Sequence, residues 1–311
     1  MSAMKFAGRM NSFIFKGDYD LLTTIQKYRS MDEITHLEFN YPEHFAQYSI
    51  EEIKEAVGDM PVNGVATRFK EPFIKGEFTN VDENVRRKAI DLCKGAVDAC
   101  RAVGGKVVTV WQAYDGFDYP FQVDYEKAWN RMIEAFREVA DYAQDILVSI
   151  EYKPYEPRNY AMLDSIGTTL LAIEEINRPN MGITLDFCHM QMKHDCPAYA
   201  LALAAKSNKL FGLHMNDGYR LMDSGLIFGS VNLSQCIEFV YYLKKYSYDG
   251  VVFFDTFPVR EETEPEICAN IRTFQKINDL IDRVGMDEFD KIISKNDGVA
   301  SQQFLVDILG L

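Results

Sequence analysis

The sequence predicts an α/β fold: a (β/α)8 barrel, the TIM-barrel architecture, followed by a C-terminal helical extension. Short apolar runs rich in Val, Ile and Phe recur eight times, and segments of helical length separate them. Strands that are buried on both faces and alternate with helices form a parallel sheet. The 311 residues accommodate such a barrel, which typically needs about 250. We expect the barrel domain over residues 1–284 and the extension over residues 285–311.

Eight apolar runs are the expected strands. The turn after the first run, Gly8-Arg9-Met10-Asn11, lacks the glycine-rich pattern with which an open sheet binds a dinucleotide, and the chain has no P-loop. A closed barrel is therefore favoured over an open, doubly wound sheet. The strands are expected, in chain order, at Lys5–Asn11, Thr35–Pro42, Val62–Phe69, Lys106–Asp115, Ile146–Pro154, Met181–His189, Lys209–Asp217 and Gly250–Pro258.

Helices are expected between these runs because start and stop signals bound the segments. The clearest is Asp82–Val103, which opens on an Asp N-cap and ends before Gly104-Gly105. Asp195-Cys196-Pro197 opens another helix, with Asp as the cap and Pro in the first turn, that ends near Lys206. The tail ends in apolar residues and would cover one end of the barrel or a neighbouring subunit. The remaining helices are expected at Val123–Tyr142, Ser165–Ile176, Leu233–Tyr246 and Pro265–Val284.

The charge balance argues against two kinds of partner. The chain has 47 acidic and 33 basic residues and a formal net charge of −14, whereas nucleic acids and anionic membranes require clustered Lys and Arg. No apolar stretch of about 18 residues predicts a transmembrane helix, and Met1 to Phe15 lack a signal-peptide pattern. The six cysteines have no CxxC or disulfide-framework spacing and are expected to be reduced, as in a cytoplasmic protein.

Four successive expected strands end in residues that are costly to bury without a partner. These residues are Glu151, Asp186, His214 and Asp255. Because a barrel gathers the carboxyl ends of its strands at one face, the four side chains can converge on one divalent cation. Oxygen donors with a single imidazole suit Mn²⁺, Mg²⁺ or Co²⁺. The alternative is a set of separate capping carboxylates with a hydrogen-bonded core histidine.

The residues around these strand ends resemble a known family. The segment Glu151-Tyr-Lys-Pro-Tyr-Glu-Pro157 is similar to the strand-five motif of the xylose-isomerase-like barrel superfamily, especially its rhamnose-isomerase-like members. Asp186-Phe-Cys-His189, His214-Met-Asn-Asp217 and Asp255 follow in the expected order. The resemblance implies that Glu151, Asp186, His214 and Asp255 bind one Mn²⁺-like ion, and that Lys153 and His189 face a sugar. It also implies proton or hydride movement beside a sugar carbonyl, which the metal polarises.

The chain departs from the family pattern in two places. Isomerases that shift a hydride use a second metal, held by the histidine after strand six and by carboxylates after strand seven. Here His189 is present, but the loop Tyr219–Gly225 has Asp223 as its only carboxylate, which argues against a complete second site. Epimerases of the family place a glutamate on strand eight, where this chain has Asp255. The departure argues against a shuttle between two glutamates.

A third branch of the superfamily fits the remaining pattern better. The segments Gly8–Phe13 and Leu37–His44 resemble the catalytic subunit of C-glycoside deglycosidases, carbon–carbon lyases that eliminate the aglycone from a 3-oxo C-glycoside. That resemblance implies a small β-rich partner subunit, and an oligomer is expected. The alternatives are a monosaccharide isomerase or epimerase, a barrel that cleaves abasic DNA, and a non-catalytic binding protein. The acidic charge argues against the DNA-cleaving barrel, and the metal carboxylates argue against the binding protein.

Further candidates lie on the loops after the strands. The candidate catalytic groups are Lys153, His189 and His44. Lys153 would act as a stabilising charge, or as an acid if its pKa is lowered. His44 would be either a base or a surface-loop histidine. The Gly229-Ser230 turn has only Arg220 as a nearby charge, so no phosphorylated substrate is expected. Phe117, Tyr119 and Phe121 form an aromatic loop that would line an aglycone site or cover the barrel end. The expected substrate contacts are Glu156, Arg158, Trp111 and Arg220. Alternatively, Glu156 and Arg158 pair with each other, and Trp111 belongs to the hydrophobic core.

Overall fold

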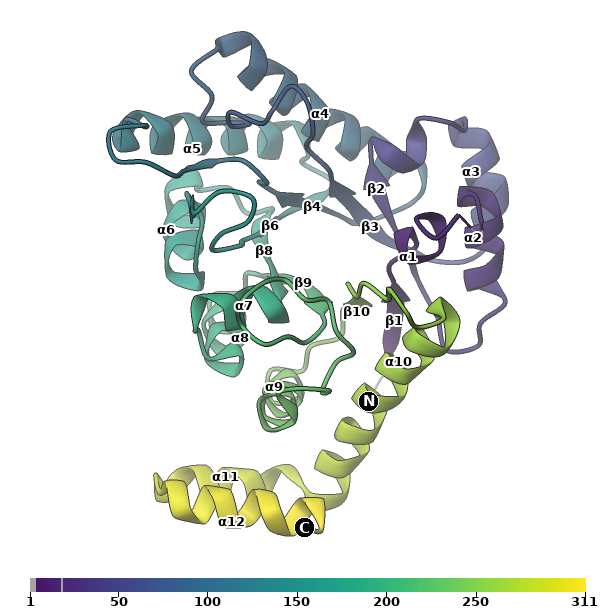
Figure 1. Cartoon of the computed structure of the whole chain (residues 1–311), viewed down its shortest axis with the longest axis vertical. Coiled ribbons are helices and arrows are strands. Elements are labelled where there is room, and N and C mark those ends of the chain that lie inside the picture. Colours follow the sequence, from purple (N-terminus) through teal and green to yellow (C-terminus); the bar gives the residue numbers. More distant parts are fainter. Residues whose placement is uncertain (1–3, 18) are drawn as a thin grey trace.

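A computed structural model describes residues 4–17 and 19–311 and confirms the barrel (Figure 1). Eight parallel strands form one sheet in the order β1-β10-β9-β8-β6-β4-β3-β2. Each strand lies inside one of the eight runs that the sequence singled out. The strands are β1 (Lys5–Gly8), β2 (Leu37–Tyr41), β3 (Val62–Thr67), β4 (Val107–Trp111), β6 (Leu147–Glu151), β8 (Met181–Asp186), β9 (Leu210–Met215) and β10 (Val251–Phe254).

The barrel closes between β1 and β2, the two ends of the strand order, through a short seam. At this seam Phe6 O accepts hydrogen bonds from the backbone N–H groups of Thr35 and His36, each at 3.0 Å. The N–H of Phe6 donates to the side-chain Oγ1 of Thr35 at 2.8 Å. A hydroxyl therefore replaces part of the backbone ladder that joins the other neighbouring strands.

Helices surround the sheet (Figure 1) and begin close to the expected signals. The predicted cap Asp82 accepts a hydrogen bond from a backbone N–H of α4; Asp124 caps α5 in the same way, and Ser165 forms a capping box with α6. The predicted cap Asp195 is wrong, because Cys196 is the N-cap of α8 and makes no side-chain cap. The six predicted helices are α4 (Glu83–Ala102), α5 (Tyr125–Tyr142), α6 (Ile166–Ile176), α8 (Pro197–Lys206), α9 (Leu233–Lys245) and α10 (Thr263–Val284).

The expected sixth strand is too long. The observed strand β8 ends at Asp186, three residues before the expected end at His189. The carboxylate of Asp186 accepts the N–H of His189 and so caps a helix that starts at the next residue. Several short elements were not predicted. They are α1 (Asn11–Ile14), α2 (Leu21–Arg29), η1 (Glu43–Phe45), α3 (Ile50–Val57), α7 (Phe187–Lys193), and the antiparallel pair β5 (Gly116–Phe117) and β7 (Tyr160–Ala161).

The C-terminal residues form two helices, α11 (Met286–Lys295) and α12 (Gly298–Leu309), that follow α10 (Figure 1). Phe289 of α11 stacks on Tyr241 of α9 with ring centroids 5.1 Å apart, and Asp290 accepts a hydrogen bond from the same tyrosine at 2.5 Å. The hairpin thus packs against the outer side of α9 and does not cover an end of the barrel. None of the described helices is both long and apolar enough to cross a membrane.

Candidate metal centre

The four predicted ligands meet at the carboxyl end of the barrel, which we call the mouth. Glu151 and Asp186 are the last residues of β6 and β8, His214 lies near the end of β9, and Asp255 directly follows β10. All four side chains are buried, and each offers one ligand atom within 4.8 Å of those of the others. Parallel pairing places Asp186 beside His214 and His214 beside Phe253, so the sheet itself brings the strand ends together.

One nitrogen of His214 faces the other candidate ligands, and Glu38 holds the second nitrogen. Its Nε2 lies 3.2 Å from Oε1 of Glu38, and Oε2 of Glu38 accepts a hydrogen bond from Asn63 at 2.6 Å. A carboxylate only accepts, so Nε2 carries a proton. Burial lowers the pKa of His214, but Glu151 and Glu38 outweigh burial and raise it well above its usual value, so Nδ1 is protonated as well and a bound cation would replace that proton. Nδ1 has no hydrogen bond in the described part of the chain and lies 3.2 Å from Oε1 of Glu151. Glu38 therefore orients the imidazole as supporting carboxylates do in metal sites.

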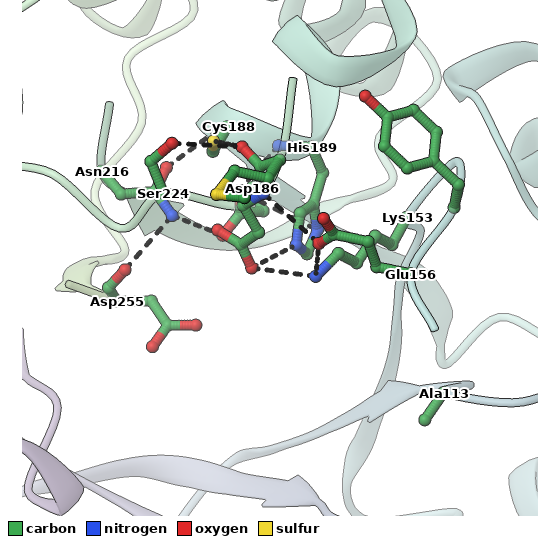
Figure 2. A network of polar contacts seen from close by, with 12 residues as sticks. Ala113, Lys153, Glu156, Asp186, Cys188, His189, Asn216, Ser224 and Asp255 are labelled. Carbon is green, nitrogen blue, oxygen red and sulfur yellow. Dashed lines mark hydrogen bonds and ion pairs between the residues drawn. The ribbon is translucent and has the colours of Figure 1, made fainter. Parts of the chain in front are cut away.

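Asp186 is held in place by two donors. Its Oδ1 accepts the N–H of His189 at 2.9 Å, and its Oδ2 accepts Nδ2 of Asn216 at 3.0 Å. The same Asn216 amide donates to the backbone oxygen of Asp255 at 3.2 Å and accepts the N–H of Cys188 at 2.8 Å (Figure 2). Asn216 thus fixes two of the strand ends relative to each other.

The electrostatics of the four residues favour a cation. Burial raises the pKa of Asp186 to about 7; His189 opposes this, and the charges of Asp223, Glu151 and Asp255 add to it. Burial also raises the pKa of Asp255, although Arg9 opposes it. For Glu151 the raising effect of burial is outweighed, chiefly by His214, so its pKa falls to about 2. Oδ1 of Asp255 has no hydrogen bond among the described residues. Three crowded carboxylates and one imidazole nitrogen fit a divalent ion.

A second group of possible ligands adjoins the first: Asp186, His189 and Asp223, again with ligand atoms within 4.8 Å of one another. Nδ1 of His189 lies 3.0 Å from the carbonyl oxygen of Tyr152 and must donate to it, which leaves Nε2 facing Oδ2 of Asp223 at 3.2 Å. The sequence argued against a complete second site because the loop has only one carboxylate. The structure places the carboxylate of Asp223 beside His189, and Asp186 is a possible ligand in both groups.

Lys153 contacts the second group as a charged ammonium. Its Nζ lies 3.2 Å from Oε2 of Glu156, as Figure 2 shows. The same Nζ lies 3.0 Å from Oδ2 of Asp223. Burial lowers the pKa of Lys153, but Asp223 and Glu156 outweigh burial and raise it. The hypothesis of an acid with a lowered pKa is therefore wrong for this arrangement. Glu156 pairs with Lys153 and, at 3.3 Å, accepts the N–H of Asp223.

His44 has no lone pair left to act as a base. Its Nδ1 accepts the N–H of Asn40 at 3.0 Å, and its Nε2 lies 2.8 Å from Oδ1 of Asn11. Burial, with help from Arg68 and Arg9 and against Glu43, lowers the pKa of His44 to about 3. The side chain is buried, so neither the predicted base nor the surface-loop alternative describes it.

One of the expected substrate contacts is directed elsewhere. The buried Arg158 donates to the backbone oxygens of Ala113, Glu156 and Lys153, so its guanidinium holds loops together and is not offered to a sugar. Arg220 is exposed and reaches Gln235 at 3.5 Å. Backbone carbonyls thus occupy Arg158, whereas a role of Arg220 in substrate binding stays a prediction.

Trp111, the last residue of β4, does lie at the mouth. The guanidinium of Arg68 and the ammonium of Lys153 lie over its ring, 5.9 and 5.4 Å from the centroid. Register pairs Trp111 with Glu151 on the neighbouring strand. Arg68, which follows β3, and Arg9, which follows β1 and places Nε 3.2 Å from Oδ1 of Asp255, were not among the predicted site residues. A search for cations at strand ends would have found both.

The fold and the site define a class of protein: a TIM barrel with a candidate divalent-cation centre at its mouth. The chain belongs to the xylose isomerase-like TIM-barrel family, whose model matches residues 28–286. This confirms the resemblance stated from the motifs, and the chain has the fold of sugar isomerases and epimerases.

Individual relatives agree with the family. The chain is 30% identical over 214 residues to a xylose isomerase of Thermus thermophilus; the match covers 67% of this chain and spans about half, 55%, of the relative. A D-tagatose 3-epimerase-like protein superposes with a TM-score of 0.73 at 17% identity, over 90% of this chain and 99% of that one. The 3-keto-D-glucoside 4-epimerase from E. coli gives 0.66 at 18% identity, over 89% and 99%.

Proposed function

We propose that this protein is a divalent-metal-dependent sugar isomerase, which moves hydrogen between the carbonyl carbon of a monosaccharide and the adjacent carbon. The convergence of Glu151, Asp186, His214 and Asp255, with Nδ1 of His214 free of hydrogen bonds to described residues, carries the proposal. The preferred ion is Mn²⁺, with Mg²⁺ and Co²⁺ as alternatives. When bound, such an ion polarises the carbonyl and hydroxyl oxygens of a sugar.

The chain's own residues supply the remaining parts of the reaction. Lys153 stays protonated beside Asp223 and Glu156 and donates an N–H to an oxygen of the sugar. His189, whose Nδ1 proton is fixed on the carbonyl of Tyr152, presents Nε2 beside Asp223, where a second ion would replace the Nε2 proton. Asp223 contacts both residues through Oδ2 and keeps them together.

Three observations support isomerisation over the other sugar reactions. The family membership and the name of the Thermus relative point to aldose–ketose exchange. The group Asp186, His189 and Asp223 provides the second set of donors that a hydride shift uses. Asp255, shorter than a glutamate and paired with Arg9, is poorly placed as the second base of an epimerase.

A second candidate is elimination of the aglycone from a 3-oxo C-glycoside, in partnership with a small β-rich subunit. One observation favours it: Phe117 and Tyr160 stack with centroids 5.1 Å apart on the pair β5–β7, which follows strand ends at the mouth. Such rings could face an aromatic aglycone. This elimination begins with removal of a proton beside the sugar carbonyl.

The metal part of the proposal is tested by titrating Mn²⁺ into the metal-free chain and into two variants. Glu151→Ala should abolish tight binding, because it removes one of three carboxylates that the ion needs. Glu174→Ala, which changes an exposed residue of α6, is the matched control and should bind as the parent does. Full stoichiometric binding by Glu151→Ala would refute the site.

The reaction is tested by incubating the Mn²⁺-loaded chain in D₂O with D-fructose, D-tagatose and D-xylulose. Conversion to the aldose supports isomerisation, and deuterium in the product reports a proton path through solvent. The lyase candidate is tested with a 3-oxo C-glycoside, alone and with small β-rich subunits, by release of the aglycone. If no sugar is converted and no aglycone is released, the proposed function is wrong.

A further inference from the structure

The side chain of Arg68 is a half-buried cation at the mouth whose charge acts on Glu43, Glu151 and Asp255 without a close ion pair to any of them. It makes no hydrogen bond or ion pair with any residue that the structure describes, and the face of Trp111 is its ring contact. The other two cations at the mouth are paired: Lys153 with Asp223 and Glu156, and Arg9 with Asp255. Withdrawing an unpaired guanidinium from water is costly, so a partner from outside the chain would stabilise it.

Arg9 lies close enough to Arg68 for their charges to interact. Arg9 follows β1 and Arg68 follows β3, and both strands lie next to β2 in the closed barrel, so the two guanidinium groups belong to the same part of the mouth. The guanidinium of Arg9 lies over the rings of Phe257 and Phe15, at 4.7 and 5.3 Å from their centroids, which fixes its plane. Two neighbouring guanidinium groups repel each other, and an anion placed at both removes that repulsion.

The position of Arg68 indicates that this anion is a group of the substrate. Arg68 follows β3, and its ring partner Trp111 ends β4 and pairs in register with the metal-ligand candidate Glu151. The free guanidinium is therefore on the same wall of the mouth as the predicted ion. A guanidinium binds planar oxyanions through two parallel hydrogen bonds, which a neutral sugar hydroxyl cannot match.

We propose that Arg68, assisted by Arg9, binds a carboxylate of the substrate, so that the protein acts on a sugar acid in preference to a neutral sugar. This inference rests on the proposed function, since it names the substrate class of the same site. A carboxylate fits better than a phosphate because, of the three cations at the mouth, Arg68 alone is unpaired among the described residues. A phosphate of nearly two negative charges would stand beside several carboxylates.

The test uses three ligands that differ at one carbon: D-fructose, D-fructuronate and D-fructose 6-phosphate. Each is titrated calorimetrically into the Mn²⁺-loaded full chain and into Arg68→Gln, Arg68→Lys and Arg272→Gln. We expect D-fructuronate to bind at least about tenfold more tightly than D-fructose, the size of a charge-assisted hydrogen bond. Arg68→Gln should abolish this ratio, and Arg68→Lys should restore part of it. Arg272, exposed on α10, is the matched control and should leave the ratio unchanged.

Several results of the same titrations would overturn the inference. Equal binding of D-fructose and D-fructuronate by the parent overturns the inference, and so does a preference that Arg68→Gln retains. Tighter binding of D-fructose 6-phosphate than of D-fructuronate overturns the choice of carboxylate. If Arg68→Gln weakens Mn²⁺ binding but not the preference, Arg68 serves the metal ligands and the inference fails. Conversion of D-fructose without a preference for the acid leaves the proposed function intact, whereas failure of all sugars to convert refutes that function separately.

Discussion

The imidazole of His214 can present Nδ1 to a cation only because Glu38 occupies Nε2. We expect Glu38→Ala to lower Mn²⁺ affinity by roughly 10- to 100-fold, the usual effect of removing a supporting carboxylate, since the ring loses its preferred orientation. Glu38→Gln still accepts the Nε2 proton and should retain part of the affinity. Metal titration of both variants tests this, and an unchanged affinity in Glu38→Ala would contradict it.

His44 makes the stability of the protein depend on pH. Its pKa is about 3 in the folded protein and about 6.5 in an unfolded chain, so below pH 6.5 the unfolded state binds more protons. The stability that His44 contributes is complete above pH 6.5 and falls as the pH decreases. Between pH 7 and pH 5 the expected loss is about 2 kcal/mol.

Urea unfolding at pH 7 and pH 5 measures this loss. A His44→Gln variant has no titrating ring, so it should show a smaller decrease than the parent, although it is less stable at pH 7. The comparison cancels the titration of all other groups. Equal decreases in the parent and the variant would show that His44 is not buried in its neutral form.

The sequence was sufficient to predict the four possible ligands because each is an acid or a histidine at the end of an apolar run. Glu38 stands in such a run too, but near its beginning, so a criterion based on strand ends passed over it. Arg158 was expected at the substrate because its loop follows β6, whose last residue is the candidate ligand Glu151. Which way a loop side chain points depends on backbone carbonyls that no local pattern reveals.

At the scale of elements, Asp217 joins the β9 strand to α9. Its two carboxylate oxygens accept the N–H groups of Gly218, Val231 and Asn232 and the amide of Asn232, all between 2.7 and 2.9 Å. This buried carboxylate closes the loop that carries Asp223. The loop is therefore anchored at its base while its tip reaches Lys153 and His189.

We expect Asp217→Asn to destabilise the protein by roughly 2–3 kcal/mol, since an amide NH₂ would face backbone donors that need an acceptor. Chemical unfolding measures the change, with Asp279→Asn on the exposed face of α10 as the control. Because the loop loses its anchor, the contact of Asp223 with Lys153 should loosen as well. A variant as stable as the parent would contradict the role of Asp217.

The long elements could be predicted from the sequence and several short ones could not. All eight barrel strands lie within the apolar runs, and six helices follow from period and capping signals. The short helix α3 has a capping box between Ser49 and Glu52, which is a local sequence signal for its start. The strands β5 and β7 have two residues each and exist only because the loops after β4 and β6 meet.

On the scale of the whole molecule, the C-terminal hairpin stabilises the barrel without reaching its mouth. Phe289 is 8% exposed and packs on Tyr241 of α9. We expect Phe289→Ala to reduce the free energy of unfolding by about 3 kcal/mol, the usual cost of such a cavity, and to leave Mn²⁺ affinity unchanged. Unfolding and metal titration of one preparation test both parts. A loss of metal affinity would connect the hairpin to the site.

The seam between β1 and β2 has a consequence for how the barrel opens. A single hydroxyl, that of Thr35, holds the amide of Phe6, so local opening there breaks fewer backbone hydrogen bonds than elsewhere around the sheet. In native-state hydrogen exchange the Phe6 amide should therefore exchange faster than that of Ile183, which donates to Lys209 O at 2.7 Å. Thr35→Val should accelerate exchange at Phe6 and leave Ile183 unchanged. Since Arg9 directly follows β1, the same fluctuation would admit solvent beside the cations of the mouth.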